Sequence, residues 1–115
     1  MLQSVKSESP LFSKTADFLV WLQNHLQNFP KHQRFRLVRR IDDAAFNFYE
    51  LLIKATRSQK KKRVILLQAD VELEKLRAYF RLARRCKYTT PKQYHHVAKV
   101  LTELGRLLGS WLKTT

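Results

Sequence analysis

Apolar residues recur every three or four positions through four successive stretches of this chain. This spacing places them along one face of a helix, so each stretch predicts an amphipathic helix. Only two glycines and three prolines interrupt the 115 residues, which disfavours a strand-rich fold. The four apolar seams are Leu19, Leu22, Leu26 and Phe29; Val38, Ile41, Ala45, Phe48, Leu52 and Ala55; Leu66, Ala69, Leu73, Leu76, Phe80 and Ala83; and Tyr94, Val97, Leu101, Leu104, Leu108 and Trp111.

The short polar connectors between these seams predict an all-α fold, an up-down-up-down antiparallel four-helix bundle. The helices are expected at about residues 13–28, 31–57, 63–87 and 91–112, within one bundle domain spanning residues 13–113. Residues 1–12 show no apolar period and are predicted to form a flexible N-terminal arm. Ser13 is a candidate N-cap. Thr90 to Gln93 read as a capping box with Pro91 at the first helical position.

The net charge of +14 is distributed unevenly, because Asp and Glu are absent from residues 18–41 and 75–102. These two stretches hold 13 of the 23 Lys and Arg residues. In an up-down-up-down bundle, both stretches meet at one end. Cations without neighbouring carboxylates create a field that attracts polyanions. We call this end the arginine end and expect it to bind nucleic acid through Arg34, Arg36, Arg39, Arg40, Arg77, Arg81, Arg84, Arg85 and Lys87.

A plain solvated surface is the alternative interpretation of the arginine end. Cations at the C-terminal end of the third helix would stabilise the helix in any protein by interacting with its dipole, and this accounts for Arg84 and Arg85. The same argument fails for residues 34–40, because cations are unfavourable near a helix N-terminus. We therefore favour polyanion binding for the set as a whole.

No catalytic residues, cofactor site or metal site are predicted. The four histidines lack metal-ligand spacing, and the lone Cys86 has no identifiable catalytic partner. His32 and Arg34 stand in the wrong order for a small helical ribonuclease that pairs an arginine with a histidine. The single cysteine suits a reducing compartment, and neither a membrane span nor a signal sequence is evident. The sequence thus predicts a cytoplasmic non-enzyme that does not bind membranes.

Gly105 and Gly109 lie one helical turn apart in the fourth helix, where each glycine costs helix stability. We assign both glycines and Trp111 to packing, either within the bundle or between subunits. The apolar face of the second helix is also wider than one core needs, which favours oligomerisation.

Two motifs resemble the accessory variability determinant proteins, Avd, of diversity-generating retroelements. They are Phe29-Pro30-Lys31-His32-Gln33-Arg34-Phe35 and Leu104-Gly105-Arg106-Leu107-Leu108-Gly109-Ser110-Trp111-Leu112. The related four-helix proteins of 23S ribosomal RNA intervening sequences usually carry Asn-Ile-Ala-Glu-Gly at the end of the second helix. Residues 52–56 of this chain read Leu-Ile-Lys-Ala-Thr instead, which argues against that branch.

The resemblance implies properties that the residues alone do not give. Avd proteins are basic four-helix bundles assembled as homopentameric barrels, and they associate with the retroelement reverse transcriptase. Together they support mutagenic cDNA synthesis from template-repeat RNA. The expected partners are therefore the reverse transcriptase, template-repeat RNA, cDNA and further copies of the chain. Two alternatives stay open, a stand-alone RNA-binding or RNA-chaperoning bundle and an adaptor that binds an acidic protein.

Overall fold

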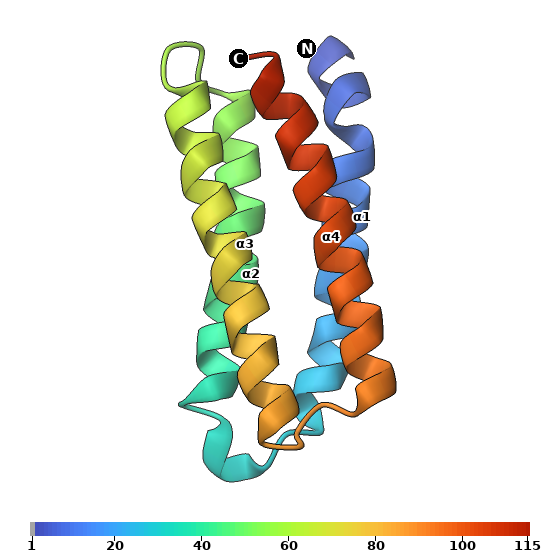
Figure 1. The fold of residues 1–115 in the computed structure, drawn as a ribbon. Coiled ribbons are helices and arrows are strands. Elements are labelled where there is room, and N and C mark those ends of the chain that lie inside the picture. The colour runs from blue at the N-terminus through green and yellow to red at the C-terminus, as the bar shows by residue number, and fades with distance from the viewer. Residues whose placement is uncertain (1) are drawn as a thin grey trace.

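The protein is a four-helix bundle whose helices run alternately up and down (Figure 1). The computed structural model describes the backbone of residues 2–115 and the side chains from Pro10 onward. The described chain contains no strand, and its longest dimension is 42 Å. The predicted all-α bundle is confirmed. In chain order the elements are α1 (Leu2–Gln27), the short 3-10 helix η1 (Lys31–Gln33), α2 (Leu37–Thr56), α3 (Lys62–Arg85) and α4 (Pro91–Lys113).

The core consists of the four predicted seams, with further residues that neighbour them on each helix. Phe48 and Phe80 are its largest fully buried side chains, and Leu22 on α1 is also fully buried. Burial of each such side chain contributes about 1.5–3 kcal/mol. Except for the partly buried Val38, Tyr94 and Trp111, every residue of the predicted seams is buried.

Helices α2 and α3 form the most closely packed pair. Both helices bury small side chains, which are Ala44 and Ala55 on α2 and Ala69 and Ala83 on α3. Alanine lets two helix backbones approach more closely than leucine does. Between α1 and α4 an open groove remains, and Phe18, Trp21 and His96 are among the residues that line it.

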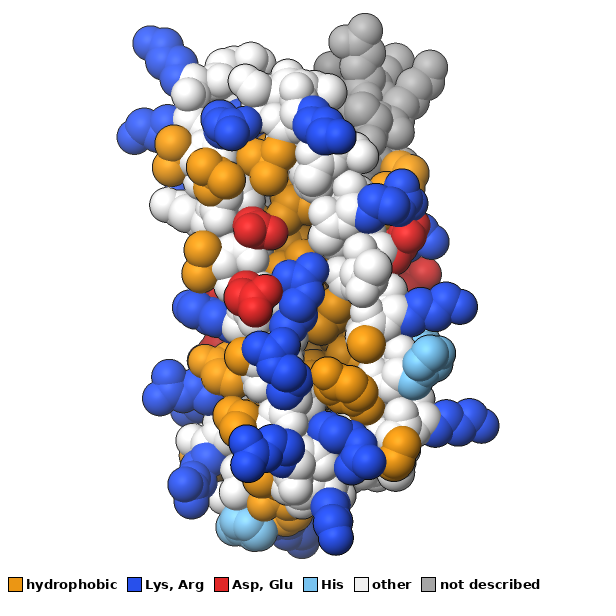
Figure 2. All heavy atoms as spheres, in the orientation of Figure 1, with side chains coloured by type: hydrophobic (Ala, Val, Ile, Leu, Met, Phe, Trp, Pro, Cys, Tyr) orange, Lys and Arg blue, Asp and Glu red, His pale blue; other side chains and the backbone are white. Residues whose placement is uncertain are grey.

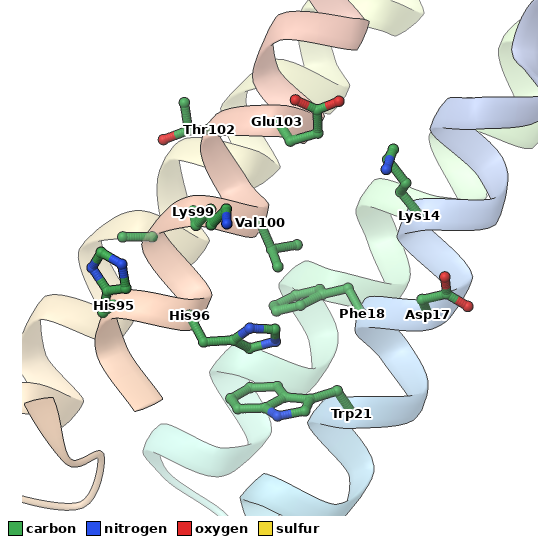
Figure 3. Close-up of a pocket in the computed structure, with 11 residues that line it drawn as sticks. Lys14, Asp17, Phe18, Trp21, His95, His96, Lys99, Val100, Thr102 and Glu103 are labelled. Carbon is green, nitrogen blue, oxygen red and sulfur yellow. The ribbon is translucent and has the colours of Figure 1, made fainter. Parts of the chain in front are cut away.

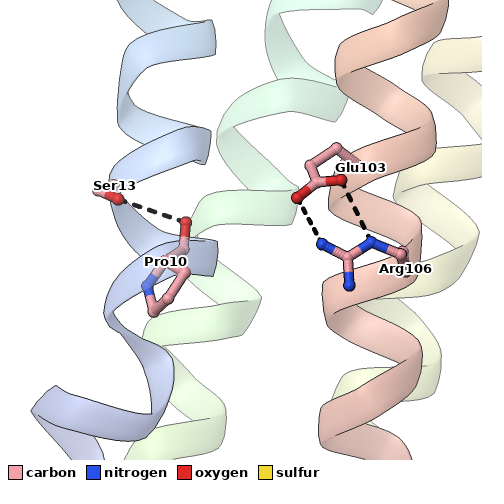
Figure 4. Close-up of polar contacts among 4 residues, drawn as sticks. All are labelled: Pro10, Ser13, Glu103 and Arg106. Carbon is pink, nitrogen blue, oxygen red and sulfur yellow. Dashed lines mark hydrogen bonds and ion pairs between the residues drawn. The ribbon is translucent and has the colours of Figure 1, made fainter.

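Helix α1 begins well before the predicted start at Ser13. Leu11 is only 3% exposed and Phe12 packs against the core, so the buried seam extends past the predicted boundary. Pro10 lies inside the helix although it has no backbone N–H to donate. Ser13 is no N-cap, since its hydroxyl donates a hydrogen bond to the Pro10 carbonyl at 3.3 Å (Figure 4). The prediction was wrong because it took Ser13 as the N-cap and found no apolar period before it.

Helix α2 begins at Leu37 and not at Lys31. Arg34 precedes the buried Ile41 by seven residues, so a continuous helix would turn its guanidinium towards the core. Burying an unpaired charge costs far more than ending a helix. The backbone instead forms η1 and a turn, and Arg36 leaves helical geometry with φ −119° and ψ −107°. This turn carries Arg34, Phe35 and Arg36 out into solvent.

The connector from α3 to α4 has tightly bonded ends. Lys87 adopts the left-handed conformation, with φ 65°, directly after α3. The N–H of Tyr88 donates to the Ala83 carbonyl at 2.9 Å and that of Lys87 to Arg84 at 3.1 Å, a Schellman motif. At the start of α4, the predicted capping box is confirmed. Its two bonds join the Gln93 N–H to the Thr90 hydroxyl and the Thr90 N–H to the Gln93 side chain.

Candidate nucleic-acid interface

The fold brings the two acid-free stretches to the same end of the bundle. The α1–α2 and α3–α4 connectors both lie there, away from both chain termini (Figure 1). Lys and Arg side chains gather over the lower part of the face shown in Figure 2, and the visible acidic side chains lie above them. The predicted residues come from the turn before α2 (Arg34, Arg36), the first turn of α2 (Arg39, Arg40), the C-terminal half of α3 (Arg77, Arg81, Arg84, Arg85) and the residue that follows its cap (Lys87).

Three members of this set have acidic partners that the sequence argument overlooked. Arg39 pairs with Asp43 at 4.0 Å, while Arg77 and Arg81 pair with Glu74 at 3.1 and 3.8 Å. These acids stand just outside the acid-free stretches, but one turn of helix brings Asp43 to Arg39 and Glu74 to Arg77, and two turns bring Glu74 to Arg81. The pairs are largely exposed, so each is worth at most about 1 kcal/mol and can exchange for a phosphate.

The other six residues of the set make no ion pair with any described residue. Five of them are exposed and Arg84 is half-buried. They can therefore meet a polyanion without first breaking an internal contact. These six free cations are Arg34, Arg36, Arg40, Arg84, Arg85 and Lys87.

Arg77 lies against the backbone of α4. A Cβ atom added to Gly105 would stand 2.7 Å from a terminal nitrogen of the Arg77 guanidinium. Glycine at this position therefore leaves the space that the guanidinium occupies. Gly109 differs, because a Cβ there would meet nothing within 4 Å. Trp111 packs against Phe12, with ring centroids 6.4 Å apart.

Phe35 is an exposed aromatic side chain at the arginine end that the sequence-based set omitted. It is 74% exposed, the highest value among the large apolar side chains of the described surface. Its signal in the sequence was the triplet Arg34-Phe35-Arg36, an aromatic ring between two arginines. The signal went unused because a helix starting at Lys31 gave Phe35 no distinct surroundings.

A buried histidine lies beneath the surface of the arginine end. His25 is 4% exposed and shares a hydrogen bond with the Thr89 hydroxyl, with 2.9 Å between Nε2 and Oγ1. Its ring contacts Trp21, Phe29 and Phe80. Burial among these aromatic rings lowers the pKa of His25 below its ordinary value. The histidine thus serves as a neutral core residue that ties α1 to the α3–α4 connector.

An open groove of about 830 Å³ lies between α1 and α4 (Figure 3). Phe18, Trp21 and His96 extend into it, and the rings of Trp21 and His96 are 4.9 Å apart. Two lysines, Lys14 and Lys99, are balanced there by two carboxylates. No three His, Cys, Asp or Glu residues in the described part of the chain gather closely enough to hold a metal ion. The groove therefore presents no concentration of one kind of charge.

The opposite end of the bundle, formed by the α2–α3 connector and the last turns of α4, is also basic. Three of its cations have partners within the chain, whereas Arg57, Lys60 and Lys61 make no ion pair with any described residue. Arg106 donates to Glu103 at 2.6 Å, and this hydrogen bond lowers the pKa of Glu103 (Figure 4). Arg63 donates to the Leu112 carbonyl at 3.3 Å, and the Lys62 ammonium stands 5.9 Å from the centre of the Trp111 ring.

Comparison with known proteins places this arrangement in a family. The model of the bAvd-like family matches residues 11–115. A solved structure of unknown function from the S23 ribosomal protein family of Bacteroides thetaiotaomicron VPI-5482 shares the fold, with a TM-score of 0.84 and 22% identity. The match covers 93% of this chain and 98% of that one.

No curated protein matches the chain. Along residues 2–115, none of the helices has both the length and the apolarity that crossing a membrane requires. The family match covers nearly the whole chain and confirms the resemblance inferred from the two sequence motifs. This chain belongs to the bAvd-like family.

Proposed function

We propose that this protein is a non-catalytic, nucleic-acid-binding accessory protein of a diversity-generating retroelement. It associates with the retroelement reverse transcriptase and supports mutagenic cDNA synthesis from template-repeat RNA. The observation that supports this proposal best is the set of six free cations at one end of a bAvd-like bundle. A surface evolved only for solubility has no need to keep its cations apart from its acids.

The arginine end acts by positioning nucleic acid. Guanidinium groups bind phosphates through paired, charge-assisted hydrogen bonds, and such contacts do not read sequence. Cations from α2 and α3 stand on neighbouring elements, so a strand lying across this end touches both. The protein then holds template RNA or its cDNA product near the polymerase and leaves all bond-making chemistry to that enzyme.

Assembly into a homopentamer is part of the proposal. Exposed apolar side chains lie on the flanks of three helices, and they offer area that a neighbouring subunit can cover. Because five chains of +14 repel one another, assembly requires this apolar area, a bound polyanion or both. The exposed side chains are Val20 on α1, Phe46 and Ile53 on α2, and Val64, Leu67, Val71 and Leu82 on α3.

Light scattering of the nuclease-treated protein, with and without RNA, tests the assembly. We expect the mass of five chains, with RNA adding to it at near-physiological salt. A monomer that takes up RNA would remove the pentamer from the proposal and leave nucleic-acid binding in place.

Binding of labelled RNA across a salt series tests the central claim. The logarithm of the affinity should fall linearly with the logarithm of the salt concentration, by about 0.7–0.9 for each phosphate contact. Co-purification with the reverse transcriptase and cDNA synthesis with and without this protein test the partner. RNA binding without effect on the polymerase would favour a stand-alone RNA-binding bundle. Absence of RNA binding would favour an adaptor for an acidic protein.

A further inference from the structure

We propose that Phe35 stacks on an unpaired nucleobase, so that the arginine end prefers single-stranded over double-stranded nucleic acid. This inference rests on the proposed function and names the form of nucleic acid that the same site holds. Phe35 lies in the turn that separates η1 from α2, and Arg34 and Arg36 flank it.

Local backbone geometry sets Phe35 apart from the other exposed apolar side chains. Those residues lie along helix flanks, where a subunit or an ordinary surface accounts for them. Phe35 lies outside the helices, where the chain leaves helical geometry at Arg36. Leaving a phenylalanine 74% exposed forgoes most of the stabilisation that its burial would give. The core gains nothing from this ring in its present position.

The charges around Phe35 select the ligand. Lys31, Arg34, Arg36, Arg39 and Arg40 occur within ten residues that contain no Asp or Glu. Arg34 and Arg36 are exposed and free of ion pairs with described residues. A hydrophobic protein partner would have to desolvate these guanidinium groups. A nucleotide satisfies both features, because its base stacks on the ring while its phosphates reach the arginines.

Stacking requires a base whose face is free. In a duplex, neighbouring base pairs cover both faces of every internal base, so the Phe35 ring reaches only the phosphates. In a single strand, the base can turn out and lie on the ring. The arginines then contribute to the binding of both forms, whereas Phe35 contributes only to the single-stranded form.

Fluorescence anisotropy of two labelled RNAs tests this division of roles. One is a 15-nucleotide strand of mixed sequence without self-complementarity, and the other is the corresponding blunt duplex. In the full chain, Phe35→Ala should weaken binding of the single strand about fivefold or more and leave duplex binding unchanged. Phe35→Tyr should bind the single strand like the parent protein, and Phe35→Leu should behave like Phe35→Ala. Because Phe35 is exposed, these variants should keep the parental unfolding temperature.

Two controls isolate the stacking. Thr102→Ala removes an exposed side chain on α4, outside the proposed assembly surface, and should change neither affinity. Stacking releases no counterions, so Phe35→Ala should retain the parental salt slope, whereas Arg36→Gln should reduce it by about 0.7–0.9.

Failure of the inference is distinguishable from failure of the proposed function. Equal losses for single strand and duplex, no loss for either, or full binding by Phe35→Leu would overturn stacking and leave the proposed function standing. Parental protein that binds neither RNA at low salt would overturn both.

Discussion

The two ends of the bundle are both basic, yet their cations are arranged differently. At the opposite end, Arg106 is bonded to Glu103, Arg63 to the Leu112 carbonyl, and Lys62 stands over Trp111. At the arginine end, six cations make no ion pair with the described residues. Arg57, Lys60 and Lys61 at the opposite end also make no ion pair with the described residues, so unpaired charge alone does not identify a binding surface. What distinguishes the arginine end is that its unpaired cations come from two separate acid-free stretches, whereas those three belong to one short connector.

Neutralising three cations at each end should give the largest contrast. Arg36→Gln, Arg84→Gln and Arg85→Gln together remove phosphate contacts that are worth about fivefold each at 0.1 M salt, so RNA affinity should fall roughly 100-fold. The matched control, Arg57→Gln with Lys60→Gln and Lys61→Gln, removes the same charge from the opposite end. The loss of RNA affinity in this control should be far smaller. Anisotropy across a salt series measures both, and equal losses would mean that net charge alone drives binding.

Acidification should destabilise the arginine end through His25. Burial lowers the pKa of His25, so the unfolded chain takes up the proton before the folded chain does. This contribution to the free energy of unfolding is complete above the ordinary histidine pKa of about 6.5 and is lost as the pH falls towards the lowered value.

Urea unfolding at several pH values between 7.5 and 5 measures this loss. His25→Gln should flatten the dependence over that window, because glutamine does not titrate. A variant with the parental pH dependence would show that His25 is not its source.

The strained Lys87 offers a test of whether the arginine end keeps charge at the expense of stability. Its left-handed backbone is unfavourable for any residue with a side chain, by about 1–2 kcal/mol, and glycine relieves it. Lys87→Gly should therefore raise the unfolding temperature by several degrees, as about 1 kcal/mol does in a domain of this size. It should also weaken RNA binding by up to about fivefold. A drop in the unfolding temperature would contradict the strain argument.

Gly105→Ala and Gly109→Ala form a matched pair with the smallest expected effects. Each change should favour helix formation by about 0.5–1 kcal/mol. Gly109 faces open space, so its variant should gain stability and keep its RNA affinity. At Gly105 the new methyl group displaces the Arg77 guanidinium, which weakens RNA binding a few-fold if Arg77 holds a phosphate. Thermal unfolding and anisotropy measure the two effects, and identical behaviour of both variants would exclude a positioning role for Gly105.

Regular features of this fold could be predicted from the sequence because their causes are local. The apolar seams and the capping box of Thr90 and Gln93 depend on residues within one or two helical turns. The start of α1 could not be predicted in this way, because Leu11 is held in the core by contacts with other helices. The predicted start of α2 was wrong for a related reason. Arg34 disfavours a helix only because Ile41, two turns later, faces a core that forms in three dimensions.

The candidate site was predictable as a region but not contact by contact. The predicted up-down-up-down topology was enough to show that the acid-free stretches meet at one end. It could not show that Glu74 reaches both Arg77 and Arg81, or that the turn before α2 exposes Phe35. Both facts depend on side-chain geometry across helical turns.

The length of the bundle makes its two ends electrically independent. Its long axis of 42 Å is several times the screening distance of about 8 Å at physiological ionic strength. A polyanion near the arginine end therefore exerts almost no force on the cations at the far end. Each end should thus meet a polyanion independently of the other, and the rate of encounter should fall as the salt concentration rises.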